Sequence, residues 1–400
     1  MVEYRIINWI SKHGYLNMNV VDLFSGVGGL SLGAARAGFN LAGAVEIDKH
    51  AIFSHQLNFP NSAHLKKDVS KLSAQDILAA CNVKEIDCVI GGPPCQGFSS
   101  IGKGNADDTR NELYVHFFRL VNELSPICFL AENVPGIMNE KYDSVREKAF
   151  SLVSERYFLL HPIKVNASNY GAPTTRTRIF FIGFRKDCSS QLKESDFFPK
   201  SIIEQVFVKD ALYGLPRIIK KEWQNESQGW RKVKMDREGE FYERLWGHIP
   251  SNVGDAESLK NLENGLVSGF LGTVHTDEII KRYGNLSFGE TDKISRSQRL
   301  DPNGFCPTLR AGTGSDKGSY QAVRPIHPTQ ARVITPREAA RLQGFPDWFR
   351  FHPTKWHSFR QIGNSVSPLV AEAMLLPLYQ YCLNVKKELL NTMVRPCSIR

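Results

Sequence analysis

The segment Met18–Phe24 (MNVVDLF), followed at once by Ser25–Gly29 (SGVGG), decides the fold class of this 400-residue chain. The first segment is a short apolar run rich in β-branched residues, and such a run predicts a buried strand. The glycines after it allow a sharp turn and let the backbone approach a ligand closely, because they carry no Cβ. An Ala- and Leu-rich stretch then runs to Gly38 and predicts a helix. This order of strand, glycine turn and helix indicates the first unit of an α/β protein.

The same alternation continues to about residue 185. We expect further strands at 41–46, 86–90, 127–131 and 179–184, and helices at 48–58 and 111–124. Strands that alternate with helices at this spacing predict a doubly wound, mostly parallel sheet. Ligands of such sheets bind at the carboxyl ends of the strands, so the functional residues are expected in the loops that follow them.

Composition excludes several classes of protein. Hydrophobic residues make up 42% of the chain and charged residues 23%, which is typical of a globular protein and excludes collagen-like, low-complexity and mostly disordered chains. No apolar run approaches the ~18–20 residues of a membrane span, and the N-terminus does not resemble a signal peptide. The 8 cysteines form no CxxC pair and no Cys/His spacing of a zinc site. We therefore expect no metal, and a reduced, cytoplasmic environment.

The stretch from about 186 to 330 differs from the first part, because it is rich in Gly, Ser and mixed charges and has no clean period. At roughly 100–200 residues per domain, the length of the chain indicates two domains, the second of which includes this stretch. The chain is also basic, with 50 Lys and Arg against 41 Asp and Glu and a net charge of +9. Residues 291–360 hold 12 of the basic and 5 of the acidic residues. A basic excess alone indicates a nucleic-acid partner only weakly.

Two carboxylates follow the glycine turn at the next expected strand ends, and this spacing is typical of a site for a nucleotide-type ligand. Glu46 ends the next expected strand, where a carboxylate can accept hydrogen bonds from ribose hydroxyls, and Asp68 follows a third strand end, in reach of an adenine amine. A glycine turn that only closes a helix onto a sheet is the alternative, but the spacing to Glu46 favours a ligand. Ser31 stands where a third glycine of GxGxxG would be, which argues against NAD and for an adenosyl ligand without a pyrophosphate.

A second motif presents a thiol. Gly91–Ser100 (GGPPCQGFSS) follows the strand at 86–90, and its prolines and glycines hold Cys95 rigidly where a nucleophile would be presented. Cys88 and Cys128 lie within expected strands and are predicted core residues. Glu132 follows the strand at 127–131 and can face the same cleft. A thiolate beside a protonatable carboxyl suits addition to an electron-poor ring.

Six motifs in this order closely resemble the DNA (cytosine-5) methyltransferases of the bacterial restriction-modification type: FSGVGG at 24–29, PPCQ at 93–96, ENV at 132–134, RTR at 176–178, REAARLQGFP at 337–346 and GNSV at 363–366. The match covers about residues 18–185 and 296–380, and the segment between them carries no family motif. The resemblance implies a Rossmann-like class I methyltransferase fold with a smaller target-recognition domain. It places the catalytic domain at 1–185 plus 356–400 and the DNA-reading domain at 186–355.

The resemblance also implies roles for individual residues. Cys95 attacks C6 of cytosine, Glu132 acts at N3, and Arg178 holds O2, while Arg176 supports the loop or a phosphate. C5 then takes the methyl group of S-adenosylmethionine. One departure is Thr174, which replaces the glutamine usual in the family two residues before the first arginine of this motif.

The cofactor pocket implied by the resemblance has Phe24 near the adenine, Glu46 at the ribose and Asp68 at the adenine amine. Its other expected members are Ser25, Gly26, Gly28, Gly29, Ile47, Val69, Pro94, Leu113, Asn364 and Val366. The expected DNA contacts are Gln96, Ser99, Thr308, Leu309 and Arg310. The loop at 97–100 is expected to close over the base.

The implied partner is double-stranded DNA, from which the target cytosine must be flipped out of the stack. The basic stretch at 291–360 is expected to contact phosphates, although Arg337 and Arg341 have the helical spacing to pair with Glu338 or Asp347 instead. We also expect a monomer that works in a bacterial or archaeal cytoplasm. A restriction endonuclease, encoded separately, is the other expected partner.

Three alternatives remain at this point. A tRNA cytosine-5 methyltransferase shares the motifs but lacks so large a central segment. A nicotinamide oxidoreductase is disfavoured by Ser31 and the Pro-Pro-Cys loop, and a non-catalytic DNA-binding relative by the presence of Cys95 and Glu132.

Overall fold

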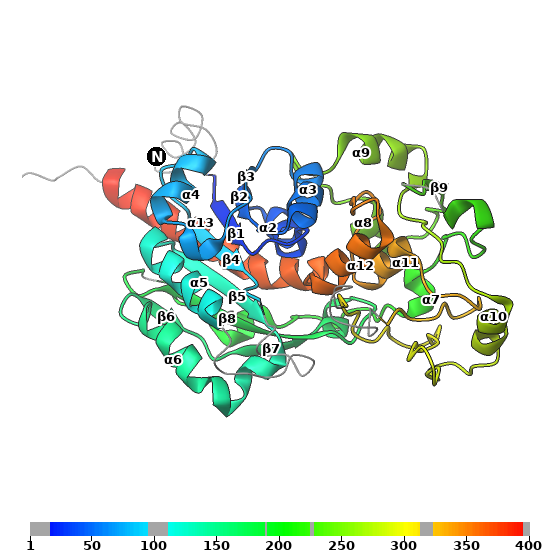
Figure 1. Cartoon of the computed structure of the whole chain (residues 1–400). Helices are drawn as coiled ribbons and strands as arrows, with labels where there is room; N and C mark the ends of the chain where they lie inside the picture. Colours follow the sequence, from blue (N-terminus) through cyan, green and yellow to red (C-terminus); the bar gives the residue numbers. More distant parts are fainter. Residues whose placement is uncertain (1–16, 95–110, 189, 225–227, 313–322, 395–400) are drawn as a thin grey trace, which may run out of the picture.

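The computed structural model describes residues 17–94, 111–188, 190–224, 228–312 and 323–394. Its centre is an eight-stranded sheet in the order β3-β2-β1-β4-β5-β8-β6, with β7 also paired to β8 (Figure 1). The strands are β1 (Asn19–Leu23), β2 (Asn40–Val45), β3 (Ala63–Leu65), β4 (Cys88–Gly91), β5 (Cys128–Asn133), β6 (Tyr157–Leu159), β7 (Ile163–Asn166) and β8 (Thr177–Arg185). The first five strands are parallel to one another, and β8 runs antiparallel to β5, β6 and β7. This order and direction confirm the predicted mostly parallel, doubly wound sheet.

Helices cover both faces of the sheet, because alternate residues of a strand point to opposite sides. Cys88 and Ile90 of β4 belong to a buried cluster with α2 and α13, whereas Val89 between them belongs to a cluster with α4, α5 and α6. These helices are α2 (Gly29–Ala37), α4 (Ala74–Cys81), α5 (Asn111–Leu124), α6 (Asp143–Ser151) and α13 (Pro368–Val394). A further helix, α3 (Lys49–Asn58), begins at the expected N-cap Asp48, whose side chain accepts hydrogen bonds from the amides of His50 and Ala51.

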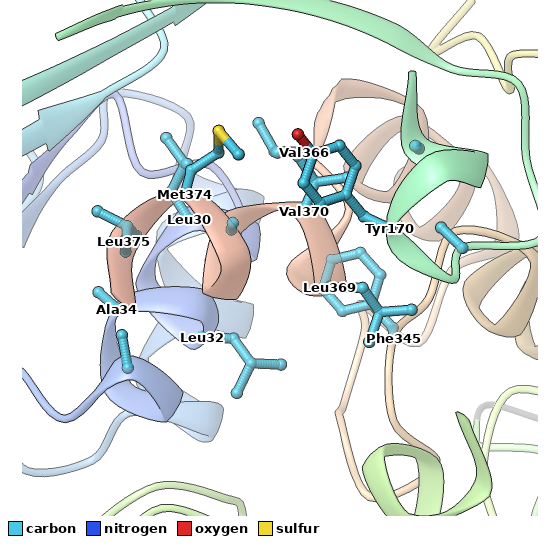
Figure 2. Packing of buried hydrophobic residues seen from close by; sticks show 14 of the residues in the cluster. Leu30, Leu32, Ala34, Tyr170, Phe345, Val366, Leu369, Val370, Met374 and Leu375 are labelled. Atoms are coloured by element: carbon cyan, nitrogen blue, oxygen red, sulfur yellow. The ribbon is translucent and has the colours of Figure 1, made fainter. Parts of the chain in front are cut away.

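The last long helix returns to the first one. In Figure 2, Val370, Met374 and Leu375 of α13 lie against Leu30 and Ala34 of α2. A Cβ added at Gly33 of α2 would overlap Ala371, so glycine permits this close approach. The segment 355–391 is the one described stretch with the length and apolar composition of a membrane span, and 61% of its apolar window is buried inside the protein. Its apolar composition is therefore explained by the packing of a core helix.

Residues 186–355 contain little sheet. Their elements are η5 (Glu194–Phe197), α7 (Val208–Ala211), η6 (Lys221–Gln224), β9 (Arg231–Lys232), α8 (Glu240–Trp246), α9 (Ala256–Glu263), β10 (Leu266–Val267), α10 (Asp277–Gly284) and α11 (Pro336–Leu342), followed by α12 (Lys355–Asn364). Phe241, Leu245 and Trp348 of this part belong to the same buried cluster as Val20 of β1. The irregular part is therefore packed on the sheet through a continuous apolar core, and its status as a separate domain stays a prediction.

Several members of the basic stretch at 291–360 are not placed to contact phosphates, and for Arg337 and Arg341 the alternative expectation, a pairing with Asp347, is the one found. Arg337, Arg341 and Arg350 are buried, and they hold carbonyl and carboxylate groups inside the protein. Arg332 is half-buried and forms a two-point ion pair with Glu338. A buried guanidinium cannot reach a phosphate, so these charges stabilise the irregular part instead. Among the described basic residues of the stretch, the exposed ones are Lys293, Arg296 and Arg310.

Candidate active site

The glycine turn after β1 is held by backbone contacts. The Ser25 amide donates to the Val45 carbonyl at 3.0 Å, which ties the turn to the end of β2. Gly26 and Gly28 have φ values of +56° and +104°, which favour glycine. A Cβ at Gly28 would overlap the ring of Phe59, so a side chain is also excluded there by space. The local sequence thus requires glycine for reasons of both conformation and packing.

Glu46 is oriented by the same turn. Its Oε2 accepts the Gly26 amide at 2.9 Å and its Oε1 accepts the Asp48 amide at 2.8 Å. Burial raises the pKa of Glu46, and the backbone hydrogen bonds oppose this shift. Each carboxylate oxygen keeps a second lone pair for a hydroxyl donor.

The space above the turn fits a ligand. No heavy atom of the described residues lies within 4 Å of a Cβ position built on Gly26. The hydroxyl of Ser25 is buried and has no hydrogen-bond partner among the described residues. Ile47 is 64% exposed beside Glu46. An open space, an unpaired hydroxyl and an exposed apolar side chain are what a nucleoside-type ligand would use.

Asp68 and Val69 line the next strand end. Asp68 Oδ1 accepts hydrogen bonds from the amide and hydroxyl of Ser70, and these bonds lower the pKa of Asp68. Asp68 is thereby the N-cap of η1 (Val69–Lys71). The side chain of Val69 is buried, so its backbone is what it can offer to a ligand.

The segment 363–366 approaches the glycine turn from the other end of the chain. A Cβ at Gly29 would overlap the carbonyl of Val366, and one at Gly363 would overlap the backbone of Ala311. Asn364 is exposed at the end of α12, and Leu113 is half-buried on α5. The GNSV segment therefore lies directly against the glycine turn although more than 330 residues separate them in sequence.

Glu132 lies against the loop that leads to Cys95. Glu132 ends β5, only 9% exposed, and its Oε1 pairs with Nε of Arg178 at 2.6 Å. A Cβ on Gly92 would lie 2.9 Å from Glu132 Oε2. The side-chain Nδ2 of Asn133 donates to the carbonyl of Pro93 at 3.4 Å. The structure thus brings the ENV motif, the second arginine of RTR and the start of the PPCQ loop together.

Arg176 acts as an internal brace. It is 3% exposed, and it donates to the carbonyls of Leu309 at 3.1 Å and Gly363 at 2.9 Å. Of its two expected roles, this geometry gives it support of the loop. Leu309 is buried, whereas Thr308 and Arg310 on either side are exposed.

Several expected residues cannot be placed. Cys95, Gln96 and Ser99, with the loop at 97–100, lie outside the described residues. Pro94, the last described residue before them, is half-buried. Cys88 and Cys128 are fully buried in the sheet, as predicted.

A chain of polar side chains beneath the glycine turn is not predicted by the sequence. Ser31 Oγ donates to Asp22 Oδ2 at 2.6 Å and lies 2.9 Å from His55 Nε2, and His55 Nδ1 lies 2.9 Å from His64 Nε2. Burial raises the pKa of Asp22 to about 7, although the hydrogen bond from Ser31 opposes the shift. Sequence spacing identifies Ser31 only as a replacement for glycine, because its contact with Asp22 is tertiary.

The family model for C-5 cytosine-specific DNA methylases matches residues 18–379. The chain belongs to this family. The type II methyltransferase M.XorII of Xanthomonas oryzae pv. oryzae is 40% identical over 88% of this chain and 82% of its own. M.DdeI of Desulfomicrobium norvegicum is 31% identical over 92% of this chain and 90% of its own.

Solved structures agree with this assignment. An E. coli prophage-encoded protein assigned as a DNA modification methyltransferase is 62% identical, covers 92% of this chain and 100% of its own, and superposes with a TM-score of 0.84. The S. pombe Dnmt2 methyltransferase, 17% identical with a TM-score of 0.61 over 92% of this chain and 100% of its own, shares the fold.

The chain is thus an S-adenosylmethionine-dependent DNA (cytosine-5) methyltransferase of the restriction-modification type. The resemblance, the fold class and the cofactor are confirmed. The tRNA, oxidoreductase and non-catalytic alternatives are not supported.

Proposed function

We propose that this enzyme methylates C5 of a cytosine flipped out of a specific duplex sequence, with Cys95 as the nucleophile and Glu132 as the acid. One observation carries the proposal. The Glu132 carboxylate abuts Gly92 in a loop that reaches Cys95 three residues later. A thiol and a carboxyl group that follow two neighbouring strands can act on two atoms of one ring, the thiol at C6 and the carboxyl group at N3.

The protein groups divide the work on cytosine. The Cys95 thiolate forms a bond from Sγ to C6 while Glu132 donates a proton at N3, so the electron pair released into the ring raises the density at C5. S-adenosylmethionine, when bound, supplies the methyl group that C5 takes. A base then removes the C5 proton, the Sγ–C6 bond breaks to release the thiolate, and the N3 proton returns to Glu132, which restores the ring and the acid.

Arg178 has donors to spare for this site. A guanidinium carries five N–H donors. Arg178 uses Nε for Glu132 and one Nη1 hydrogen for the Thr177 carbonyl at 2.7 Å. Its other donors can hold cytosine O2, so that Glu132 fixes the arginine and the arginine fixes the ring.

The cofactor is held by the turn and its neighbours. Glu46 is oriented for the ribose hydroxyls and Asp68 for the adenine amine, while Phe24, Ile47 and the backbone of Val69 line the adenine. Ser25, Gly26, Gly28 and Gly29 allow the close approach of the backbone, and Pro94, Leu113, Asn364 and Val366 close the pocket. The open space over Gly26 and the unpaired Ser25 hydroxyl support this arrangement.

DNA is bound by the irregular part. Gln96 and Ser99 are proposed to contact the DNA around the vacated space, and Thr308 and Arg310 the groove, with Leu309 positioning them from the core. Flipping costs a few kcal/mol, which these contacts offset. We further propose that 186–355 is the target-recognition domain and 1–185 plus 356–400 the catalytic domain. The enzyme is proposed to act as a cytoplasmic monomer beside a separately encoded endonuclease that cuts the same sequence.

A covalent trap tests the mechanism. Duplex DNA in which 5-fluorocytosine replaces cytosine should form a stable adduct with the enzyme and S-adenosylmethionine, because fluorine cannot leave as a proton does. Cys95→Ser should form no adduct on a denaturing gel, and Glu132→Gln should form it far more slowly. Cys188→Ser, a half-buried thiol after β8, is the matched control and should react like the unmodified enzyme. An adduct in Cys95→Ser would show that another group is the nucleophile.

A further inference from the structure

Three histidines from distant parts of the chain meet between α3 and α12. The ring nitrogens that His50, His352 and His357 can offer as ligands all lie within 4.8 Å of one another. His50 Nδ1 and His352 Nε2 are 3.0 Å apart, and the rings of His50 and His357 stack at 3.7 Å between centroids. Each histidine is half-buried. No step of the methyl transfer uses them.

The backbone under these rings is fixed by one buried side chain. Gln361 of α12 donates from Nε2 to the His50 carbonyl at 2.8 Å and accepts the His352 amide on Oε1 at 3.0 Å. Its Nε2 also lies 3.0 Å from the hydroxyl of Ser54. A single glutamine therefore sets the separation of the two segments that carry the rings, as a preorganised site requires.

The surroundings favour the neutral form of His352 and His357. Burial, together with the neighbouring rings of His357 and His50, lowers the pKa of His352 to about 4. Burial and the His50 ring also lower the pKa of His357. The charged groups that act on the rings are Asp48, Lys49 and Arg360, and Asp48 pairs with Arg360 at 3.1 Å.

We propose that His50, His352 and His357 form a binding site for a divalent transition-metal ion of the Zn²⁺ class, with water completing its coordination. Neutral imidazole is the preferred nitrogen ligand of Zn²⁺, Ni²⁺ and Cu²⁺, and three protein ligands plus water are a common set. A proton is repelled by the crowded rings, whereas a metal ion uses all three lone pairs at once. The ion would join the first turn of α3 to the segment that begins α12.

Binding requires two local changes. The Thr354 amide donates to His352 Nδ1 at 3.1 Å, so the ring proton of neutral His352 is on Nε2, facing His50. If His352 binds the ion through Nε2, its ring proton moves to Nδ1, and the hydrogen bond from the Thr354 amide is lost. The Thr354 amide can then bind water, because Thr354 is exposed. The stacked ring of His357 must also turn so that its nitrogen faces the ion.

Sequence spacing alone does not reveal this site. Zinc motifs are recognised by ligands close together in sequence, whereas His50 and His352 are 302 residues apart. The absence of such spacing excludes a local zinc motif, and leaves open a site assembled by the fold.

Cobalt binding to the full-length, chelator-treated enzyme tests the proposal without any measurement of activity. Co²⁺ should bind with visible d–d bands and without the intense near-ultraviolet band of a thiolate ligand, and Zn²⁺ should displace it. His352→Gln and His357→Gln should each weaken binding at least tenfold. His161→Gln changes an exposed histidine between β6 and β7 and should leave binding unchanged.

Three results would overturn the proposal: no Co²⁺ or Zn²⁺ binding below millimolar concentration, equal affinity in all variants, or a thiolate band that Cys95→Ser removes. If a variant does not fold, NMR of the unmodified enzyme still tests whether Zn²⁺ binds to these three histidines. Zn²⁺ should then shift the ring ¹⁵N signals of three of the 11 histidines, and a different number or none would contradict the site. Because the readout is metal binding, failure here leaves the proposed methyl transfer untouched.

Discussion

The sheet region (residues 17–185) and the irregular region (residues 186–355) of this enzyme hold their functional parts in different ways. In the sheet region, Glu46 and Glu132 are placed by the ends of parallel strands and by glycines that let backbones meet. In the irregular region, the chain is held by buried arginines that gather carbonyls from several loops, as Arg341 does with Ala211 and Tyr213. The strand ends and glycine turns of the sheet region therefore follow from local sequence. The arginine contacts of the irregular region depend on residues that are far apart in the sequence.

The largest expected effect is in the sheet region, at Glu132. Glu132→Gln keeps an acceptor for Arg178 but cannot deliver a proton, so we expect the rate of methyl transfer to fall about 10²–10⁴-fold while the fold is kept. Single-turnover transfer of a labelled methyl group to duplex DNA measures it. Glu112→Gln, on the exposed side of α5, is the control and should change the rate little. A Glu132→Gln rate within tenfold of the original would remove Glu132 from the acid role.

The matching test in the irregular region is Arg341. Its Nε and Nη2 pair with both carboxylate oxygens of Asp347 at 2.9 and 2.6 Å, and both side chains are fully buried. Arg341→Met removes the two-point partner of the buried Asp347 and leaves it only the Trp246 indole at 3.0 Å and the Arg337 guanidinium at 4.0 Å. We therefore expect a loss of about 3–5 kcal/mol in the free energy of unfolding. Urea denaturation measures this loss.

Two further variants make the Arg341 test specific. Asp347→Leu added to Arg341→Met should recover part of the stability, because the unpaired charge is gone. Arg296→Met removes an exposed arginine of the same region and should cost less than about 0.5 kcal/mol. Equal losses for Arg341→Met and Arg296→Met would mean that the buried pair does not hold this region.

These two regions also show how far the sequence predicts the molecule. Strands with continuous apolar runs, such as β1, β4 and β5, and the amphipathic helix α5 are predicted within a few residues. The strand end expected before Asp68 corresponds to β3, whereas the three-residue strand β6 carries too little pattern. Helix α4 is missed although Ser73 and Asp76 form a capping box at its start. The likeness of six motifs to a known family, rather than periodicity, supplies most of the site.

What the sequence cannot supply is which polar groups meet in the interior. A stretch with 12 basic residues suggests a DNA surface, and their spacing offers only Arg337 and Arg341 an internal partner, yet the structure buries Arg350 as well. The residue type alone does not show whether an arginine pairs with a buried aspartate or contacts a phosphate. Only the tertiary structure distinguishes the two. The contacts of Asp22 and of the three clustered histidines escape sequence reasoning for the same reason.

Asp22 tests whether the sheet region also contains costly buried charge. Its pKa is raised to about 7 in the folded protein by burial, against about 3.9 in an unfolded chain. The folded state therefore binds the extra proton, and stability is lost as the pH rises through this window. Asp22→Asn cannot ionise, so its stability relative to the unmodified enzyme should rise by about 1.4 kcal/mol for each pH unit between about 4 and 7.

The pKa of Asp68 is shifted in the opposite direction, so the pH dependence of its contribution to stability has the opposite sign. Hydrogen bonds from Ser70 lower the pKa of Asp68, so its contribution is present at neutral pH and is lost as the pH falls through the folded pKa. Asp68→Asn should therefore be less stable than the unmodified enzyme at pH 7, with the difference shrinking in acid. Urea unfolding at several pH values gives both profiles, and a flat profile for Asp22→Asn would mean that Asp22 is not the titrating group.

A glycine pair compares packing in the two regions. Gly29→Ala would press a methyl group against the carbonyl of Val366, so we expect a loss of about 1–3 kcal/mol and weaker S-adenosylmethionine binding. A Cβ at Gly284, in the last turn of α10, meets nothing closer than 3.9 Å, so Gly284→Ala should be neutral or slightly stabilising. Denaturation and cofactor titration of both variants measure the contrast. Similar behaviour of the two would show that the GNSV segment does not depend on this close approach.

The smallest expected effect concerns the part of the irregular region that we propose to face DNA. Arg310 is exposed next to Leu309, whose carbonyl the buried Arg176 holds, so the guanidinium is presented from a fixed backbone. If it contacts a phosphate, Arg310→Gln should weaken DNA binding uniformly across sequences and reduce the slope of log K against log salt by about 1. Lys148→Gln, on the outer helix α6 of the sheet region, removes the same charge and should leave the slope unchanged. Equal slopes for the two variants would mean that net charge alone attracts the duplex, whereas a reduced slope in Arg310→Gln alone locates a phosphate contact beside the brace that links the irregular region to the active site.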